Sequence, residues 1–149
     1  MTKFYSLAGV GVDDGTVPFV PGDAALRGGK VHALVATIDL AANAVLIGDT
    51  IDWGSLPKGA VPIIGFLTGS VSMGTAVLDV GITGTAAAFR AAATFTAVDT
   101  PTAFMKGSAI GVAMTGTTRV QSVIATGNMP NSATNKLTMV LLYTTPHSG

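Results

Sequence analysis

Apolar residues recur at every second position in several short segments, which is the period of a β-strand. The same period predicts strands at residues 31–40, 45–51, 61–68, 75–82, 109–114, 120–125 and 137–144, with extended structure again at residues 94–98. In the first segment Val31, Ala33 and Val35 share one face, and Leu34, Ala36 and Ile38 share the other. Both faces of that strand are apolar, so we expect neither to be fully exposed to water.

Residues 85–93 are the one segment predicted to be helical. The segment is rich in alanine, which has the highest helix propensity, and it contains Phe89 and Arg90. Thr85 is placed to cap its N-terminus. Because so short a helix is unstable in isolation, we expect it to lie on the surface of the domain.

Turns rich in Gly, Asn and Pro separate the predicted strands, for example at residues 127–135. The chain shows no fixed-period repeat and no linker. Short strands with turn signals at close spacing are typical of an antiparallel sandwich or barrel. We therefore predict a mainly β fold: a jelly-roll-like antiparallel β-sandwich of about seven or eight strands with one short helix.

Residues 1–30 have a different character. Glycines and prolines interrupt them, and Phe4, Tyr5 and Phe19 are spread among these breaks. This composition predicts an extended N-terminal arm, followed by a single β-sandwich domain over residues 31–149. An apolar arm has to pack either on its own domain or on a neighbouring subunit, and Phe4, Tyr5 and Phe19 are the candidate anchors.

The composition favours an assembly component. At 149 residues the chain has the length of one domain, and only 11% of its residues are charged, against ~25% in an ordinary domain. The net charge is zero, and no basic stripe marks a nucleic-acid partner. A surface poor in charge and rich in apolar groups is one that partners cover. The chain has no cysteine and therefore no thiolate chemistry.

Membrane and export signals are weak. Residues 59–78 carry no charge, but Pro62 and several glycines interrupt them, and two strands joined by a turn explain them better than a span. The apolar stretch at residues 4–12 ends at an Asp pair, and no cleavage site follows it. We expect no membrane partner and no secretory signal.

Catalytic chemistry is not expected. His32 and His147 are the only histidines, and no G-x-S-x-G elbow accompanies them. Asp49 and Asp52 offer oxygens for calcium, but a calcium site needs more ligands than this spacing supplies. We predict no catalytic residue, no cofactor and no metal.

Trp53 is the single tryptophan and the remaining candidate partner-binding residue. Tryptophan is enriched at interfaces and in cores, and both interpretations stand ahead of a sugar-stacking platform. With Tyr5, Tyr143 and the nearby aspartates, Trp53 leaves one alternative function open, a carbohydrate- or ligand-binding β-sandwich module such as a tail or fibre component.

One series of motifs is more specific. Its elements are Gly-Asp-Thr-Ile at residues 48–51, Leu-Pro-Lys-Gly-Ala at 56–60, a hydrophobic strand with a Ser/Gly turn, and Leu-Asp-Val-Gly at 78–81. The series resembles a pattern in small structural proteins of tailed bacteriophages, the head decoration or cement proteins. The resemblance extends over residues 27–98, including the entry at 27–36 and the Ala/Phe segment at 83–93.

The resemblance implies a virion structural protein with no catalytic residues. It implies a homotrimer at local threefold positions on the capsid exterior, bridging adjacent subunits of the major capsid protein, with synthesis in the host cytoplasm. The aromatic arm is not part of the shared pattern.

Overall fold

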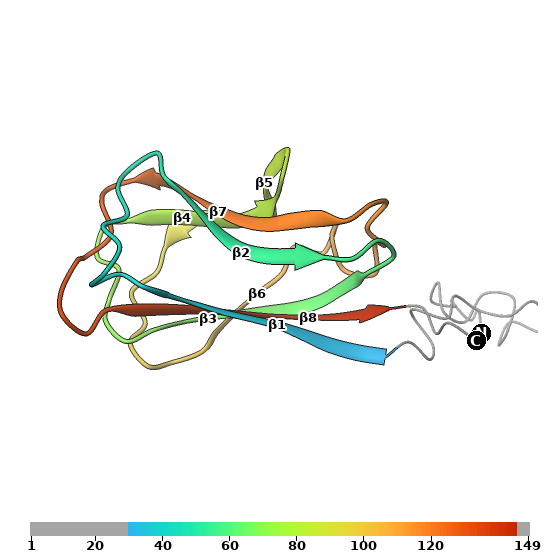
Figure 1. Cartoon of the computed structure of the whole chain (residues 1–149), viewed down its shortest axis with the longest axis horizontal. Helices are drawn as coiled ribbons and strands as arrows, with labels where there is room; N and C mark the ends of the chain where they lie inside the picture. Colours follow the sequence, from blue (N-terminus) through green and yellow to red (C-terminus); the bar gives the residue numbers. More distant parts are fainter. Residues whose placement is uncertain (1–29, 146–149) are drawn as a thin grey trace, which may run out of the picture.

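The computed structural model of the protein describes residues 30–145, which form eight strands and no helix (Figure 1). The strands are β1 (Lys30–Asp39), β2 (Thr50–Leu56), β3 (Val61–Gly69), β4 (Val77–Ile82), β5 (Thr85–Thr94), β6 (Thr102–Phe104), β7 (Thr118–Thr126) and β8 (Lys136–Thr145). Every strand pairing in the two sheets is antiparallel. The predicted fold class is confirmed apart from its helix.

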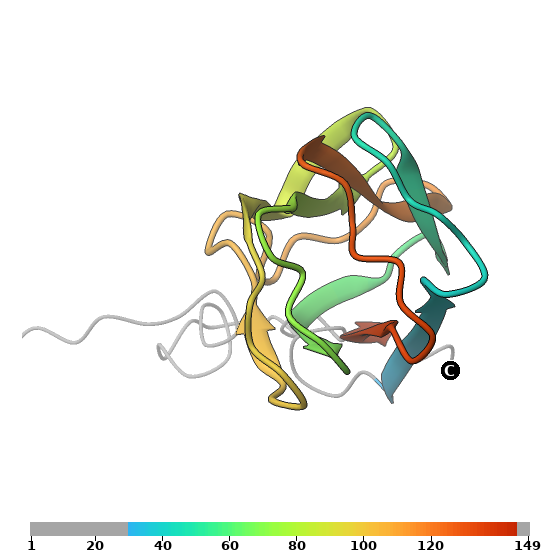
Figure 2. The same ribbon diagram turned by 90° about the vertical axis from the view of Figure 1, so that its left-hand side faces the viewer.

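The strands form two four-stranded sheets, with the orders β1-β8-β3-β6 and β2-β7-β4-β5. Figures 1 and 2 show them as two layers. The first strand pairs with the eighth, the second with the seventh, the third with the sixth and the fourth with the fifth. These nested pairs alternate between the two sheets, which is the arrangement of a jelly roll.

The core lies between the sheets because alternate residues of each strand point inward. On β8 the inward residues Leu137, Met139 and Leu141 are fully buried. Leu78 on β4 and Ile124 on β7 are equally buried on the opposite sheet. Strands with a clear two-residue period were therefore predicted well. Five predicted segments coincide with observed strands: 31–40 with β1, 61–68 with β3, 75–82 with β4, 120–125 with β7 and 137–144 with β8.

The helix predicted at residues 85–93 is wrong, because this segment is the edge strand β5. Phe89 is 1% exposed and fills the core. The Arg90 guanidinium donates to the carbonyls of Leu78, Ala93 and Thr94, which holds β5 against β4. Alanine's helix preference amounts to only about 0.7 kcal/mol per residue or less over ordinary residues, and this packing and pairing outweigh it.

Three other segments differ from prediction. Residues 45–49 form a turn, and β2 begins only at Thr50. Residues 109–114 are a loop in which the N–H of Val112 bonds the carbonyl of Ala109. Residues 94–98 were predicted to be extended, but only Thr94, the last residue of β5, and Val98, which forms a single β-bridge with Gly69, have strand-type pairing. Residues 45–49 and 109–114 are rich in apolar residues, but their backbone N–H groups bond outside any strand ladder of their own: the N–H of Gly48 bonds the carbonyl of Ile124, and that of Met114 bonds the carbonyl of Ala60. The three-residue strand β6 carries too little pattern to be predicted.

Candidate docking surface

The outer face of the β1-β8-β3-β6 sheet is apolar across all four strands. Val35 on β1 pairs with Val140 on β8, Val140 pairs with Phe66 on β3, and Phe66 pairs with Ala103 on β6. The next row pairs Ala33, Leu142 and Ile64 in the same way. Together with Val31, these two rows form the apolar face, which consists of Val31, Ala33, Val35, Ile64, Phe66, Ala103, Val140 and Leu142.

The apolar face contains no charged side chain. Charges stand only at its end, where Asp39 is the partner of Lys136. A row of hydroxyls precedes them, with Thr37 and Thr138 in hydrogen-bond contact at 2.8 Å. Val35 is 62% exposed. Because the solvated face of an antiparallel sheet normally carries polar residues, this face has the character of a surface that another protein covers.

An apolar hollow of about 310 Å³ extends this surface. It lies beside β3 and β6, and a bulge between Pro62 and Ile64 turns Ile63 outward to 37% exposure. Ile110, from the loop after β6, is 53% exposed at its rim. The residues around the hollow are Ile63, Ile64, Ala103, Phe104, Met105 and Ile110.

The opposite sheet has a polar outer face. Arg119 on β7 makes a salt bridge to Asp52 on β2, with Nη2 2.8 Å from Oδ2. Burial acts to raise the pKa of Asp52, but the hydrogen bonds from Arg119 and from the N–H of Gly54 outweigh it and leave the pKa below its ordinary value. Thr83 and Gln121 are hydrogen-bonded on the same sheet. The two faces of the sandwich therefore differ in kind, and only one of them lacks charge.

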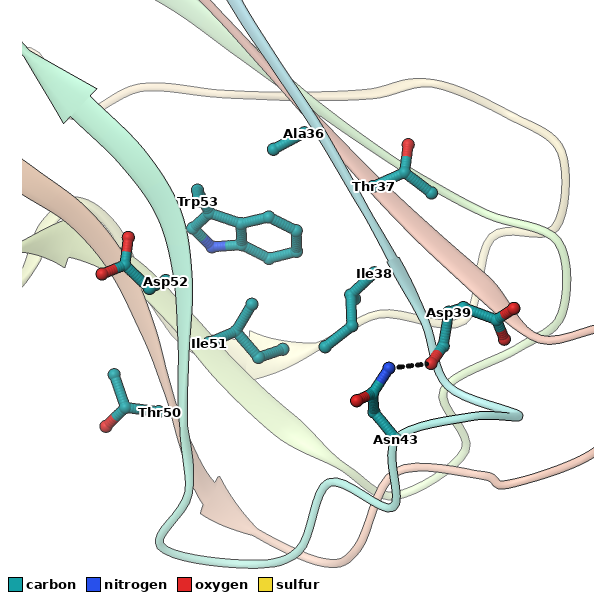
Figure 3. Close-up of a pocket in the computed structure, with 9 residues that line it drawn as sticks. All are labelled: Ala36, Thr37, Ile38, Asp39, Asn43, Thr50, Ile51, Asp52 and Trp53. Atoms are coloured by element: carbon teal, nitrogen blue, oxygen red, sulfur yellow. Dashed lines mark hydrogen bonds between the residues drawn. The ribbon is translucent and has the colours of Figure 1, made fainter.

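A slot of about 440 Å³ opens between β1 and β2, the edge strands of the two sheets. Figure 3 shows Ile38 of β1 and Ile51 and Trp53 of β2 pointing into it, with Asn43 at its end. The Asn43 amide donates to the carbonyl of Asp39 at 2.8 Å. The slot thus has a mixed lining, in which the apolar side chains of Ile38, Ile51 and Trp53 alternate with polar residues of the same two strands.

Trp53 lies in the core and lines the slot. It is 4% exposed, and its indole N–H donates to the Ser122 hydroxyl at 2.8 Å. The residue therefore offers no open ring face on which a sugar stacks. Phe4, Tyr5 and Phe19, the other predicted partner-binding residues, lie outside the described residues.

The aspartates considered for calcium, Asp49 and Asp52, and the histidine of the described region have protein partners. The Asp49 carboxylate accepts the N–H of Leu46 at 2.8 Å, and Asp52 is paired with Arg119. His32 stacks on Tyr143 with 5.4 Å between ring centroids. Residues 30–145 hold no cluster of three or more potential metal ligands, and no helix among them is fit to cross a membrane.

The exposed apolar turn at Leu46 and Ile47 was not predicted from the sequence. Leu46 and Ile47 are 49% and 57% exposed. Their N–H groups donate to the side chains of Asp49 and Asn128, so polar groups hold the turn in place. Asn128 is 81 positions away in the chain from Ile47, and local sequence carries no signal for that contact.

Comparison with solved structures gives the class of protein. The chain resembles a chain in the capsid of Ralstonia phage GP4, with a TM-score of 0.67 and 27% identity over 80% of this chain and 87% of that one. A chain of the cyanophage Pam1 capsid asymmetric unit matches with a TM-score of 0.63 and 21% identity over 85% and 91%. A chain of the acid-stable capsid of Helicobacter pylori bacteriophage KHP30 matches with a TM-score of 0.57 and 18% identity over 78% and 89%.

No protein-family model matches the sequence, and no curated protein sequence does so either. The structural matches cover similar shares of both partners, so the matched capsid chains are about as long as this one. The protein has the fold of a small chain found in phage capsids. This likeness supports a phage capsid-related structural protein located in the virion.

Proposed function

We propose that the protein is a non-enzymatic decoration, or cement, protein that binds the exterior of a phage capsid and stabilises it. The observation that carries the proposal is the uncharged apolar face on one side of a jelly roll whose other side is polar. Burial of apolar area contributes roughly 25 cal/mol per Å². A sheet-wide face therefore supplies a substantial contact without any charged pair.

The partner in this proposal is the major capsid protein of the shell. A fold shared with small capsid chains supports a partner within the same particle. The β1–β8 part of the face is in unbroken register, and β3 departs from regular pairing only at the bulge between Pro62 and Ile64. The counterpart of the face on the shell is accordingly a surface poor in charge, and their contact depends little on ionic strength.

The proposed assembly is a homotrimer on local threefold positions, bridging adjacent major capsid protein subunits. Closed symmetry lets every copy bury the same surface. In this assembly residues 1–30 act as an arm, and Phe4, Tyr5 and Phe19 anchor it on a neighbouring subunit. The protein is made in the host cytoplasm and added to the outside of the head.

A matched pair of charge substitutions tests the proposal on shells that lack the protein. Val35→Lys places a charge on the exposed β1 side of the apolar face, whereas Ala125→Lys places one at an exposed position of β7 on the polar sheet. We expect Val35→Lys to weaken co-sedimentation with shells by about tenfold or more, because a charge is desolvated on binding. Ala125→Lys should bind as the wild type does. Equal binding by both variants would overturn the role of the apolar face.

A further inference from the structure

Strand β1 is an edge strand without the usual protection against strand addition. It pairs with β8 in unbroken register over ten residues, from Lys30 to Asp39. It contains no proline and no bulge, and its charged residues stand only at its two ends. Edge strands of this kind present free N–H and C=O groups to another strand.

The other edges of the described domain are interrupted. The register of β2 shifts between Asp52 and Gly54. The pairing of β5 shifts twice along β4, and β6 has only three residues. Such bulges and short lengths are the means by which proteins block edge pairing. Among these four edges, β1 alone is open along its length.

The core is also open beneath β1. The inward residues Leu34, Ala36 and Ile38 remain only partly buried, whereas the inward residues of the neighbouring strand β8 are fully buried. The 440 Å³ slot lies on this side, from Ala36 towards Asn43 (Figure 3). Near the middle of β1 it closes, because a Cβ on Gly54 would lie only 3.0 Å from Cδ1 of Leu34. A strand added to β1 would cover these residues with alternate side chains.

We infer that residues 3–12 of a second copy add to the free edge of β1 and place alternate side chains in the slot. The inference rests on the proposed function, because it names the neighbouring subunit as another copy of this chain. Residues 3–12 contain no proline, and Phe4, Ala8, Val10 and Val12 fall on one face of a strand.

Length and position support a second copy as the donor. Residues 1–29 precede β1 and span up to ~95 Å when extended, whereas a ten-residue strand spans ~33 Å. The arm joins the domain at Lys30, at the end of β1 remote from the slot. Each copy has one arm and one acceptor edge, so a closed ring of copies satisfies every edge.

The test measures association of the full chain in solution, without shells. Ala36→Arg fills the slot, and Ala33→Arg places the same group on the opposite side of the same strand. In the arm, Val10→Pro removes a backbone donor from the added strand. By light scattering after gel filtration, we expect the wild type and Ala33→Arg to associate, and Ala36→Arg and Val10→Pro to be monomeric.

A second measurement keeps the inference testable if Ala36→Arg fails to fold. We expect amide exchange at Leu34–Ile38 to be about tenfold slower in the wild type than in Val10→Pro. A synthetic peptide of residues 2–13, added in excess, should dissociate the wild-type oligomer and change the fluorescence of Trp53. The same peptide with Val10→Pro should do neither.

Three results would overturn the inference. The first is association that neither Ala36→Arg nor Val10→Pro reduces. The second is equal amide exchange at β1 with and without Val10→Pro. The third is a monomeric wild type whose β1 amides are protected by the arm, which would place the arm on its own edge. Ala33→Arg separates this inference from the proposed function, because it should lose shell binding and keep self-association.

Discussion

Trp53 on β2 and Ser122 on β7 are joined by a buried 2.8 Å hydrogen bond from the indole N–H to the hydroxyl oxygen. Both residues belong to the core side of one sheet, and Ser122 has no exposed surface. The bond satisfies a donor that would otherwise be buried without a partner. It therefore anchors the indole of the single tryptophan in the core between β2 and β7.

We expect Ser122→Ala to lower the free energy of unfolding by about 1–3 kcal/mol, because the indole N–H loses its acceptor. Urea unfolding followed by circular dichroism measures this loss. In a Trp53→Phe background, which has no indole donor, the same Ser122→Ala change should cost clearly less. An equal cost in both backgrounds would show that the hydrogen bond is not its source.

Gly81 on β4 allows the backbone of β5 to approach closely. A Cβ at this position would lie 2.1 Å from the carbonyl oxygen of Ala86 and 2.2 Å from that of Thr85. Backbone atoms cannot move aside as a flexible side chain does. We expect Gly81→Ala to destabilise the domain by about 1–3 kcal/mol.

Gly116→Ala is the matched control, since a Cβ there meets no atom within 4 Å. Its effect should lie within about 0.5 kcal/mol of zero. Thermal unfolding of both variants compares the two sites directly. A harmless Gly81→Ala would contradict the close β4–β5 packing that replaces the expected helix.

Asp79 gives the stability a definite dependence on pH. It is 6% exposed, and burial raises the pKa of its carboxyl despite the N–H of Val123 and the nearby charge of Arg90. The folded state therefore holds the proton more tightly than the unfolded chain. The resulting stability is fully present below the unfolded pKa and is lost as pH rises through the folded pKa.

We accordingly compare the unfolding free energies of the wild type and of Asp79→Asn. The difference, wild type minus variant, should decrease as pH rises from about 4 to 7. Asp52→Asn is the control of opposite sign, because the lowered pKa of Asp52 contributes stability that is lost as pH falls. That second effect should be small, since Asp52 is 38% exposed. Urea titrations across this range test both, and a rising difference for Asp79→Asn would contradict the sign.

The strands predicted from sequence are those whose core contacts impose a two-residue period, such as β8. Strand β5 was missed because its alanines favour a helix locally, and only the burial of Phe89 and the contacts of Arg90 make it a strand. Tertiary contacts override propensity in such segments.

The apolar face was predicted in part. Two apolar faces on residues 31–40 predicted that neither side of β1 is fully exposed to water, whereas Val31 and Val35 on its outer side are 63% and 62% exposed in the single chain. The contributions of Phe66 and Ala103 depend on which strands pair and in what register. That register is set by contacts distant in sequence, so the extent of the apolar face emerges only from the structure.

Stabilisation of the shell is a direct consequence of the proposed role. Addition of the protein to bare shells should raise the temperature at which they disrupt and their resistance to low salt. Each bound copy stabilises the assembled state by mass action. Val35→Lys, at equal concentration, should leave both thresholds near those of bare shells. No rise with the wild-type protein would contradict a cementing role, and the virion role would then lie elsewhere in the particle.

The most direct measurement is the copy number of this chain in purified phage particles, by quantitative mass spectrometry relative to the major capsid protein. A decoration protein on regular shell positions should give a ratio near one, or a simple fraction set by the threefold sites. A handful of copies per particle would instead place the chain in the tail, fibre or portal region. Absence from the particle would contradict the account as a whole.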